Sequence, residues 1–437
     1  MKKMVFSFIA LTFLFAVYST EALAGPNNVI PGRYIVVLHD DADGAAAARD
    51  VASAHGLVPR HVYSVALKGF SAAIPSARLG AVTSDPRVKF VEPDLVVWAI
   101  APPAGGPPGK NKDGGGGGGG DTPPPPQDLP TGIDRIYVAP DSPTANGVDV
   151  DIAIIDTGVD KGHPDINFHK GVTVAGTGKP GGKDNNGHGT HVAGIAAARN
   201  NSEGVIGVAP GARIWAVKVL DKFGGGSIAG VVAGIDWLTR FASEVEVANM
   251  SLGAIGTSNS LRLAIQNSTA AGILYAVAAG NSRRDVYGSD GALGGGSALN
   301  PGAYDSIPAA YPEVVTVSAI ADYDGKPGGK WTGKTSWGAD DTFASFSNYG
   351  VAVDLAAPGV DINSTWVGGG YKSISGTSMA SPHVAGAAAL YISTHAAASV
   401  AATTDALINN GASQADAYGF LGDPDSSAEP LVCIGCP

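Results

Sequence analysis

The stretch Asp151-Ile152-Ala153-Ile154-Ile155-Asp156 is a continuous apolar run that ends on a carboxylate. Similar runs recur through the second half of the chain, and segments with helical periodicity lie between them. Strands that are apolar on both faces and alternate with helices are typical of a parallel sheet covered by helices. We therefore predict an α/β fold, with its sites beyond the carboxyl ends of the strands.

Two units are expected on either side of a spacer. In the larger unit we predict strands at 151–155, 214–219, 245–250, 273–278, 314–319 and 353–356, and helices at 190–199, 227–241, 258–271 and 378–393. In the smaller unit we predict a strand at 34–38, a helix at 45–55, paired strands at 62–67 and 70–74, a helix at 77–84 and a strand at 88–91. The β-α-β-β-α-β order of the smaller unit indicates a ferredoxin-like α+β sandwich.

The spacer, residues 101–126, contains seven consecutive glycines and four consecutive prolines. Such a composition buries little apolar area, so we interpret it as an exposed linker. At the start of the chain, Lys2 and Lys3 precede an apolar run that ends before Ala22-Leu23-Ala24. This pattern predicts a signal peptide over residues 1–24, because the run is shorter than the ~20 residues that span a bilayer. We expect an exported protein without a membrane span.

Composition narrows the classes of function. The 437 residues include 44% hydrophobic residues, enough for a sizeable core, and carry a net charge of −11. That charge argues against a surface for nucleic acid or anionic membranes. Cys433 and Cys436 are the two cysteines. In an exported chain they indicate a local disulfide or no bond at all, since two ligands do not make a zinc site.

Three polar residues stand where a sheet of this kind places its chemistry. Asp156 ends a strand, His188 lies in Gly187-His188-Gly189-Thr190-His191 before an Ala-rich segment, and Ser378 lies in Gly376-Thr377-Ser378-Met379-Ala380-Ser381-Pro382-His383 before another. Taken singly, each has a structural interpretation as a strand-end cap, a packed histidine or a helix N-cap. Taken together, they form an Asp, His, Ser series within one α/β unit.

These segments resemble the three catalytic signatures of the subtilisin-like serine proteases, the subtilase or peptidase S8 family. The resemblance covers about residues 127–400 and includes Asn249-Met250-Ser251-Leu252-Gly253 and Ala278-Ala279-Gly280-Asn281. It implies that Ser378 is the nucleophile, that His188 is the general base and acid, and that Asp156 orients the imidazole. It also implies that Asn281 and the Ser378 backbone N–H stabilise the oxyanion.

The resemblance further implies a substrate-binding cleft and a cation site. The cleft would clamp an extended peptide between two edge segments and leave an open pocket for large apolar or aromatic side chains; its residues would be Gly224, Gly225, Gly226, Ser251, Leu252, Gly253 and Gly280. The cation site would hold a structural Ca²⁺ through oxygen ligands from Gln127, Asp165, Arg199, Asn201, Glu203 and Val205.

By the same resemblance, residues 25–100 are an inhibitory and chaperoning propeptide with an I9-type inhibitor fold, and residues 127–437 are the catalytic domain. Phe90-Val91-Glu92-Pro93-Asp94 resembles the segment before the processing junction, so we expect self-cleavage near residues 98–101 or within the linker. The implied product is a secreted, monomeric endopeptidase that acts on proteins and peptides. Its partner before cleavage is its own propeptide.

Three other functions compete with this interpretation. An α/β-hydrolase esterase needs a Gly-x-Ser-x-Gly elbow and the order Ser, Asp, His, neither of which is present. A zinc hydrolase built on His188 and His191 lacks the adjacent Glu and the helical spacing of that motif. The remaining alternative is a catalytically degenerate protein that binds peptides.

Overall fold

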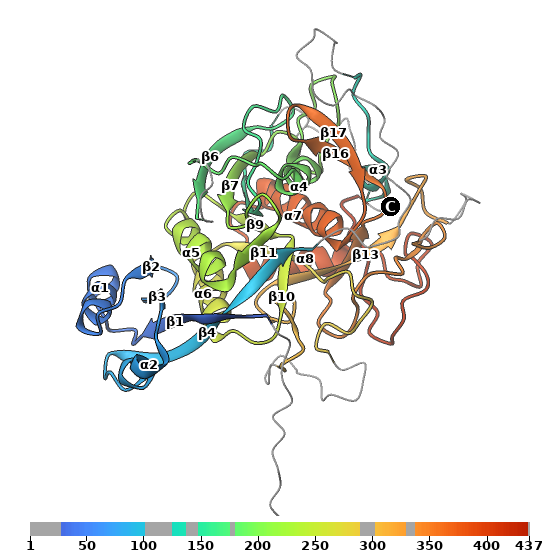
Figure 1. The fold of residues 1–437 in the computed structure, drawn as a ribbon. Helices are drawn as coiled ribbons and strands as arrows, with labels where there is room; N and C mark the ends of the chain where they lie inside the picture. Colours follow the sequence, from blue (N-terminus) through green and yellow to red (C-terminus); the bar gives the residue numbers. More distant parts are fainter. Residues whose placement is uncertain are drawn as a thin grey trace, which may run out of the picture.

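The computed structural model describes residues 28–100, 125–136, 147–174, 180–288, 302–328 and 337–435. They form a small unit, residues 28–100, and a large unit that contains all later elements (Figure 1). The predicted signal peptide and residues 101–124 of the predicted linker lie outside the described residues. Cys436 also lies outside them, whereas Cys433 is disulfide-bonded, and the sequence holds no third cysteine.

The small unit is a four-stranded antiparallel sheet with two helices. Its strand order is β4 (Val88–Ala99), β1 (Val29–Leu38), β3 (Gly69–Ala73) and β2 (Pro59–Tyr63). Helix α1 (Gly44–Ala54) follows β1, and α2 (Ser76–Thr83) follows β3. This arrangement confirms the predicted ferredoxin-like order, with the first strand of the predicted pair displaced toward the N-terminus.

The large unit is built on a mostly parallel sheet. Its order is β14 (Thr342–Phe343), β13 (Val315–Ala321), β11 (Leu274–Ala278), β9 (Val247–Met250), β5 (Asp151–Asp156), β7 (Arg213–Lys218) and β6 (Phe168–Thr173), and β15 (Leu355–Pro358) also pairs with β13. The β13–β14 pair is antiparallel, and the other pairs are parallel. All six predicted strands are present, whereas β6 was not predicted because its sequence is polar.

Helices cover both faces of this sheet. Ile152 and Ile154 of β5 join the core beneath α4 (His188–Ala197) and α7 (Thr377–Thr394). Ala153 and Ile155 point to the opposite face and join the core beneath α5 (Ile228–Thr239) and α6 (Asn259–Ala270). The period of two along the strand therefore assigns alternate side chains to two cores, as expected for a sheet buried on both faces.

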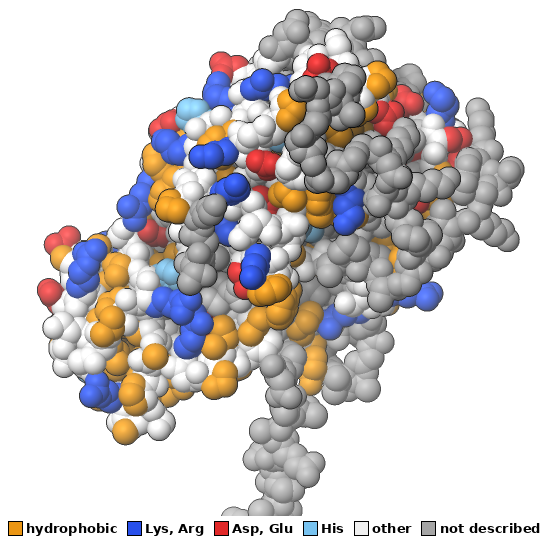
Figure 2. Space-filling view, turned by 45° about the horizontal axis from the view of Figure 1, so that its top comes forward, with side chains coloured by type: hydrophobic (Ala, Val, Ile, Leu, Met, Phe, Trp, Pro, Cys, Tyr) orange, Lys and Arg blue, Asp and Glu red, His pale blue; other side chains and the backbone are white. Residues whose placement is uncertain are grey.

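Other elements lie around this three-layered body. They are α3 (Thr131–Arg135), α8 (Val400–Asn410) and the hairpin of β16 (Ile362–Trp366) and β17 (Gly370–Ile374), which packs on α4 through the Ser364 hydroxyl and the His191 carbonyl. No helix within the described ranges is long and apolar enough to cross a membrane. Figure 2 shows the small unit as a lobe beside the large one, with acidic and basic side chains interspersed on the visible face.

Strand β4 joins the two units. Its first half pairs with β1, and its second half lies between β8 (Gly225–Ser227) and β10 (Leu252–Ile255) of the large unit, antiparallel to both (Figure 1). The sequence predicted a strand that ends at Val91, but β4 continues to Ala99. The extra residues are extended because partners from the large unit satisfy their backbone groups, which local propensity cannot reveal.

Candidate active site

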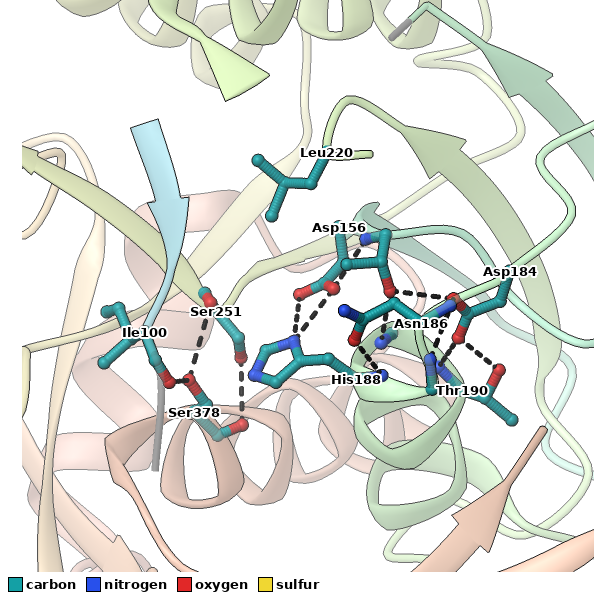
Figure 3. A network of polar contacts seen from close by, with 12 residues as sticks. Ile100, Asp156, Asp184, Asn186, His188, Thr190, Leu220, Ser251 and Ser378 are labelled. Carbon is teal, nitrogen blue, oxygen red and sulfur yellow. Dashed lines mark hydrogen bonds and ion pairs between the residues drawn. The ribbon is translucent and has the colours of Figure 1, made fainter. Parts of the chain in front are cut away.

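A buried carboxylate and a buried imidazole meet at the carboxyl end of β5. Asp156, the last residue of β5, is fully buried, and His188, the first residue of α4, is 5% exposed. The Nδ1–H of His188 lies 2.9 Å from each oxygen of Asp156, and the Thr157 N–H also donates to Asp156 Oδ1 (Figure 3). This pairing fixes the ring so that Nε2 is free to accept a proton.

Two glycines allow α4 to begin so close to the sheet. Gly187, before the helix, has φ +116°, and a Cβ there would lie 2.3 Å from the ring of Trp366. A Cβ on Gly189 would lie 2.2 Å from the Gly158 carbonyl and 3.2 Å from Asp156 Oδ1. The glycines on both sides of His188 are therefore required by backbone conformation and by close approach.

The electrostatic surroundings of His188 favour its cationic form overall. Burial lowers the pKa of His188, but the charge of Asp156, the hydrogen bond to Asp156 and the charge of Asp184 together raise that pKa above its ordinary value. A base with a raised pKa accepts a proton more readily and holds it while charge develops on the substrate.

Ser378 lies in the first turn of α7 and faces this pair. Its hydroxyl donates to the carbonyl oxygen of Ile100 at 2.9 Å, and that carbonyl belongs to the residue after β4. The Nε2 atom of His188 is buried and has no hydrogen-bond partner among the described residues. Figure 3 shows His188 between Asp156 and Ser378, with Ile100 on the other side of the serine. With Ile100 in place, the serine hydroxyl is thus engaged by the peptide carbonyl and not by the imidazole.

Asn281 follows β11 and approaches the turn before α7. Its Oδ1 accepts hydrogen bonds from the backbone N–H and the hydroxyl of Thr377, both at 2.9 Å. Because Oδ1 is engaged in this way, the amide nitrogen is directed away from Thr377, and it lies 2.9 Å from the place a Cβ on Gly376 would occupy. An amide donor is thereby held beside the residue that precedes Thr377 and Ser378.

A chain of polar side chains supports Ser378 from below. The Ser251 hydroxyl donates to the Ser378 carbonyl at 2.9 Å, Asn249 donates to the Ser251 hydroxyl, and Ser381 donates to Asn249 Oδ1. All four residues are buried. The Asn249 and Ser381 roles were not predicted, although both residues lie inside the motifs that carry the family resemblance.

The predicted clamp residues border the end of β4 on two sides. Val97 and Trp98 are registered with Gly226 and Gly225 on one side, and Trp98 and Ala99 with Gly253 and Leu252 on the other. The remaining contacts continue the ladder: Ala99 N–H donates to Gly224 O at 2.8 Å, and Ile100 N–H donates to Ser251 O at 3.1 Å. Six of the seven predicted cleft residues therefore lie along the extended segment from Val97 to Ile100.

Glycine is needed at these positions for different reasons. A Cβ on Gly225 would lie 3.0 Å from the Trp98 ring, and one on Gly253 would lie 3.2 Å from the Ile307 carbonyl and 3.9 Å from Ile100 Cδ1. At Gly280, with φ +115°, a Cβ would instead lie 2.3 Å from Asn348 Nδ2. Gly280 is thus explained here by its contact with Asn348, and part of the insertion next to it, residues 289–301, lies outside the described residues.

The six residues predicted for calcium form one connected network. Asp165, which is fully buried, accepts hydrogen bonds from Asn201 Nδ2, the Val205 N–H and the Tyr371 hydroxyl. The other contacts are Gln127 Nε2 to Arg199 O, Arg199 N to Asp165 O and Glu203 N to Asn201 Oδ1.

This donor set fits a hard cation. Asp165 forms no ion pair with any residue of the described ranges, so nothing there neutralises its buried charge. The remaining groups are backbone carbonyls and the side-chain amides of Gln127 and Asn201. A rotation of a side-chain amide by 180° would direct its oxygen toward a cation. Oxygen-rich loops of this composition suit Ca²⁺.

A second acidic group was not predicted. Asp322, Asp324 and Asp340 place carboxylate oxygens within 4.8 Å of one another. Asp322 already has a cation beside it, since the buried Arg135 lies 3.0 Å from its Oδ2. Asp322 and Asp324 are two positions apart and Asp340 follows on the same stretch of chain, but none of them was singled out from the sequence.

His191 does not complete a metal site with His188. Its Nε2–H donates to the carbonyls of Ile362 and Lys372, at 3.1 and 2.8 Å, on the β16–β17 hairpin. Burial lowers the pKa of His191 to about 3, which keeps the ring neutral. The second histidine of the motif therefore anchors the hairpin to α4.

A buried Asp–His pair that faces a serine at a helix N-terminus, with an extended segment across it, is typical of hydrolases with a serine nucleophile. The family model described as "Subtilase family" matches residues 147–423. The chain belongs to this family and is a serine endopeptidase of the subtilisin type.

Individual relatives agree with this assignment. Subtilisin Savinase of Lederbergia lenta is 40% identical over 265 residues, which cover 60% of this chain and 84% of the relative. Subtilisin E of Bacillus subtilis (strain 168) is 33% identical over 390 residues, 89% of this chain and 87% of the relative. The solved structure of a cold adapted subtilisin-like serine proteinase matches with a TM-score of 0.52 and 34% identity, over 70% of this chain and 98% of that one.

Proposed function

We propose that Ser378, His188 and Asp156 hydrolyse peptide bonds through an acyl-enzyme. Ser378 Oγ attacks the carbonyl carbon, and His188 Nε2 takes its proton, so that an ester forms as the peptide C–N bond breaks. His188 gives that proton to the leaving amine and then activates a water molecule that releases the acid. Asp156 stays ionised and holds the imidazole through Nδ1–H.

The oxyanion of each tetrahedral intermediate is assigned to two donors, the Asn281 amide and the Ser378 N–H. Thr377 supports this role for Asn281, because its two donors fix the amide oxygen and so orient the amide with its nitrogen on the opposite side. Loss of one such side-chain donor typically lowers kcat by ~100–1000-fold.

The observation that carries the proposal is the position of Ile100. The segment from Val96 to Ile100 is an added strand between β8 and β10, and its last carbonyl accepts a hydrogen bond from the Ser378 hydroxyl. A substrate bound in the same way would place its scissile carbonyl where the Ile100 carbonyl lies. The side chain of the residue before the scissile bond would then lie beside Gly253, as the Ile100 side chain does. We infer broad cleavage after apolar or aromatic residues.

We further propose that residues 25–100 are the propeptide and that the enzyme cuts its own chain between Ile100 and Ala101. Two carboxylates support this function, because they reach the N-termini of the helices behind the cleft. Asp94 accepts from Ala229 N of α5, and Glu92 accepts from the N–H groups of Asn259 and Ser260 at the start of α6. Negative charge at helix N-termini favours this docking.

Calcium is proposed as a structural cofactor held by Gln127, Asp165, Asn201 and the carbonyls of Arg199, Glu203 and Val205. When bound, the cation would neutralise Asp165 and tie the residues after the linker to the loop that follows α4. It would stabilise the fold and take no part in the chemistry. The mature enzyme is proposed to be a secreted monomer, released after removal of residues 1–24.

The proposal is tested with purified wild-type precursor and a Ser378→Ala variant. The wild type should convert itself to a form whose first residue is Ala101, and this form should hydrolyse casein. A serine-directed sulfonyl fluoride should abolish the hydrolysis, while a brief exposure to chelator should not. The variant should remain uncut, with a loss in kcat on the order of 10⁶-fold, a magnitude that is known from subtilisin itself and does not come from this geometry.

Two outcomes would contradict the proposal in different ways. Cleavage of the pure Ser378→Ala precursor would show that removal of the propeptide does not depend on Ser378. A folded, processed wild type without activity on casein would instead favour the degenerate peptide-binding protein.

A further inference from the structure

Asp184 is a buried carboxylate near the active site that the proposed mechanism does not use. It lies in the loop before α4 and is 2% exposed. Its two oxygens accept five hydrogen bonds from four residues, at 2.7–3.1 Å: Thr157 Oγ1, Asn186 N and Gly187 N bond to Oδ1, and Thr190 N and Oγ1 bond to Oδ2. A buried charge with so many donors is held in one orientation.

These donors come from both sides of the Asp156–His188 pair. Asn186, Gly187 and Thr190 flank His188 on the loop and first turn of α4, whereas Thr157 follows Asp156 on β5 (Figure 3). Thr157 closes the link, because its hydroxyl donates to Asp184 and accepts from the Gly189 N–H at 2.9 Å. One carboxylate thus ties the end of β5 to the start of α4.

A buried lysine completes the arrangement on the opposite side of Thr157. Lys218, the last residue of β7, is 1% exposed and donates through Nζ to the carbonyls of Thr157 and Leu220. Burial lowers the pKa of Lys218, and the charges of Asp184 and Asp156 oppose that shift. Thr157 is therefore held at its hydroxyl by Asp184 and at its carbonyl by Lys218.

We propose that Asp184 is a positioning residue of the endopeptidase, which fixes Asp156 and His188 relative to each other through its hydrogen bonds on both sides of the pair. This inference rests on the proposed roles of Asp156, His188 and Ser378. Asp184 touches neither the peptide segment at Ile100 nor the serine, so it acts through the pair that it connects.

The charge of Asp184 leads to a specific expectation for the pH dependence of kcat/KM. The charges that act on His188 are the carboxylates of Asp156 and Asp184. Among the other titratable groups nearby, His191 is neutral, and Lys218 lies in register with Asp156 on the neighbouring strand. The charge of Asp184 is one of the causes that raise the pKa of His188. The acidic limb of kcat/KM follows that pKa, because His188 must be neutral to act as a base. Removal of the charge should therefore move the limb to lower pH.

The test uses Asp184→Asn in the processed enzyme with a soluble chromogenic peptide. We expect kcat at the pH optimum to fall by about 10- to 100-fold, since small misplacements of catalytic groups cost this much, while KM changes less than twofold. The acidic limb should lie at lower pH than in the parent. The matched control is Asp151→Asn, at the opposite end of β5, which is also buried and bonded to Arg213 and Trp215. The control should leave the limb in place.

A second pair of variants keeps the test decisive if Asp184→Asn does not fold. Thr157→Val removes the hydroxyl that joins Asp184 to Gly189, and Thr157→Ser retains it. We expect Thr157→Val to lower kcat by at least tenfold, whereas the kcat of Thr157→Ser should stay within threefold of the parent value. An unchanged limb with unchanged kcat in Asp184→Asn, or equal activity of the Val and Ser variants, would overturn the positioning role. A parent enzyme that resists sulfonyl fluoride would instead contradict the proposed function.

Discussion

The two units bury their sheets in different ways. In the large unit, helices of the same unit cover both faces of the sheet. In the small unit, Val36 and Leu38 of β1 face α1 and α2, whereas Ile35 and Val37 face the core that contains α5 and α6 of the large unit. The small unit therefore has a complete fold but an incomplete core. The second face of its sheet is covered by residues of the large unit.

The polar contacts between the units run in both directions. Glu92 and Asp94 of the small unit reach the N-termini of α6 and α5, and Asp236 of α5 accepts from the N–H groups of Ser64, Val65 and Ala66. Each unit thus satisfies buried groups of the other. Such an interface is specific, because a buried carboxylate or N–H group that loses its partner destabilises the complex.

The strongest test of this difference is to separate the units. Residues 28–100 alone should show no cooperative thermal transition by circular dichroism. The exposed side chains would include Ile35, Val37, Tyr63, Leu95 and Val97. At about 1.5–3 kcal/mol each, their burial matches the whole stability of a small domain, ~5–15 kcal/mol.

The uncut Ser378→Ala precursor is the control, and the small unit should melt cooperatively within it. A sharp melting transition of the isolated small unit, with a slope typical of its size, would show that its own core is sufficient. The small unit would then not depend on the large unit for its stability.

A smaller effect is expected when one reciprocal contact is removed. Asp236→Ala in the mature enzyme should weaken inhibition by an added 28–100 fragment, because three N–H groups lose a buried acceptor. A loss of about 2–5 kcal/mol corresponds to a rise in the inhibition constant of roughly 30- to 4000-fold. The measurement is inhibition of peptide hydrolysis. Asp405→Ala, on the exposed side of α8, should leave the constant unchanged.

Calcium should act on one unit and leave the other unaffected. Ca²⁺ at 100 times its Kd stabilises a protein by about 2.7 kcal/mol, so the Tm of an enzyme of this size should rise by roughly 3–5 °C. Asp165→Asn should abolish this rise, whereas Asp324→Asn, in the separate acidic group, should retain it. A rise in Tm that survives in Asp165→Asn and is lost in Asp324→Asn would place the stabilising site at the second acidic group.

The smallest effect concerns the cleft that the small unit and a substrate would share. Gly253→Ala places a methyl group 3.9 Å from Ile100 Cδ1 and 3.2 Å from the Ile307 carbonyl. We expect kcat/KM for peptides with a large residue before the scissile bond to fall by about 10-fold, with little change for alanine. Gly230→Ala, where a Cβ meets nothing closer than 3.7 Å, is the control. Equal losses for both peptides would place the pocket elsewhere.

The sequence was sufficient to select residues that the fold brings together when those residues lie in local motifs. Asp156, His188, Ser378 and Asn281 lie in short, distinctive segments, and the six central strands were visible as apolar runs. It was insufficient where structure depends on contacts between distant segments. The second half of β4 is a strand because β8 and β10 flank it, and its own residues give no sign of an end at Ala99.

Residues that act on the active site from outside the motifs were also missed. Asp184 lies four positions before His188 but looks like an ordinary loop aspartate until its five donors are seen. Lys218 at the end of an apolar strand would be interpreted as a strand terminus, and its position behind Thr157 comes from the pairing of β7 with β5. Gly280 stays a prediction as a pocket residue, and the structure adds that a Cβ at this position would lie 2.3 Å from Asn348 Nδ2.

The covalent continuity of β4 with the large unit would also determine how inhibition by the proposed propeptide depends on dilution. While Ile100 and Ala101 are joined, the segment that fills the cleft belongs to the same molecule, and its local concentration does not change when the protein is diluted. After a cut at this bond, occupancy of the cleft would follow ordinary mass action and fall as the two fragments spread apart. Release into a large volume would therefore activate the enzyme without any further signal.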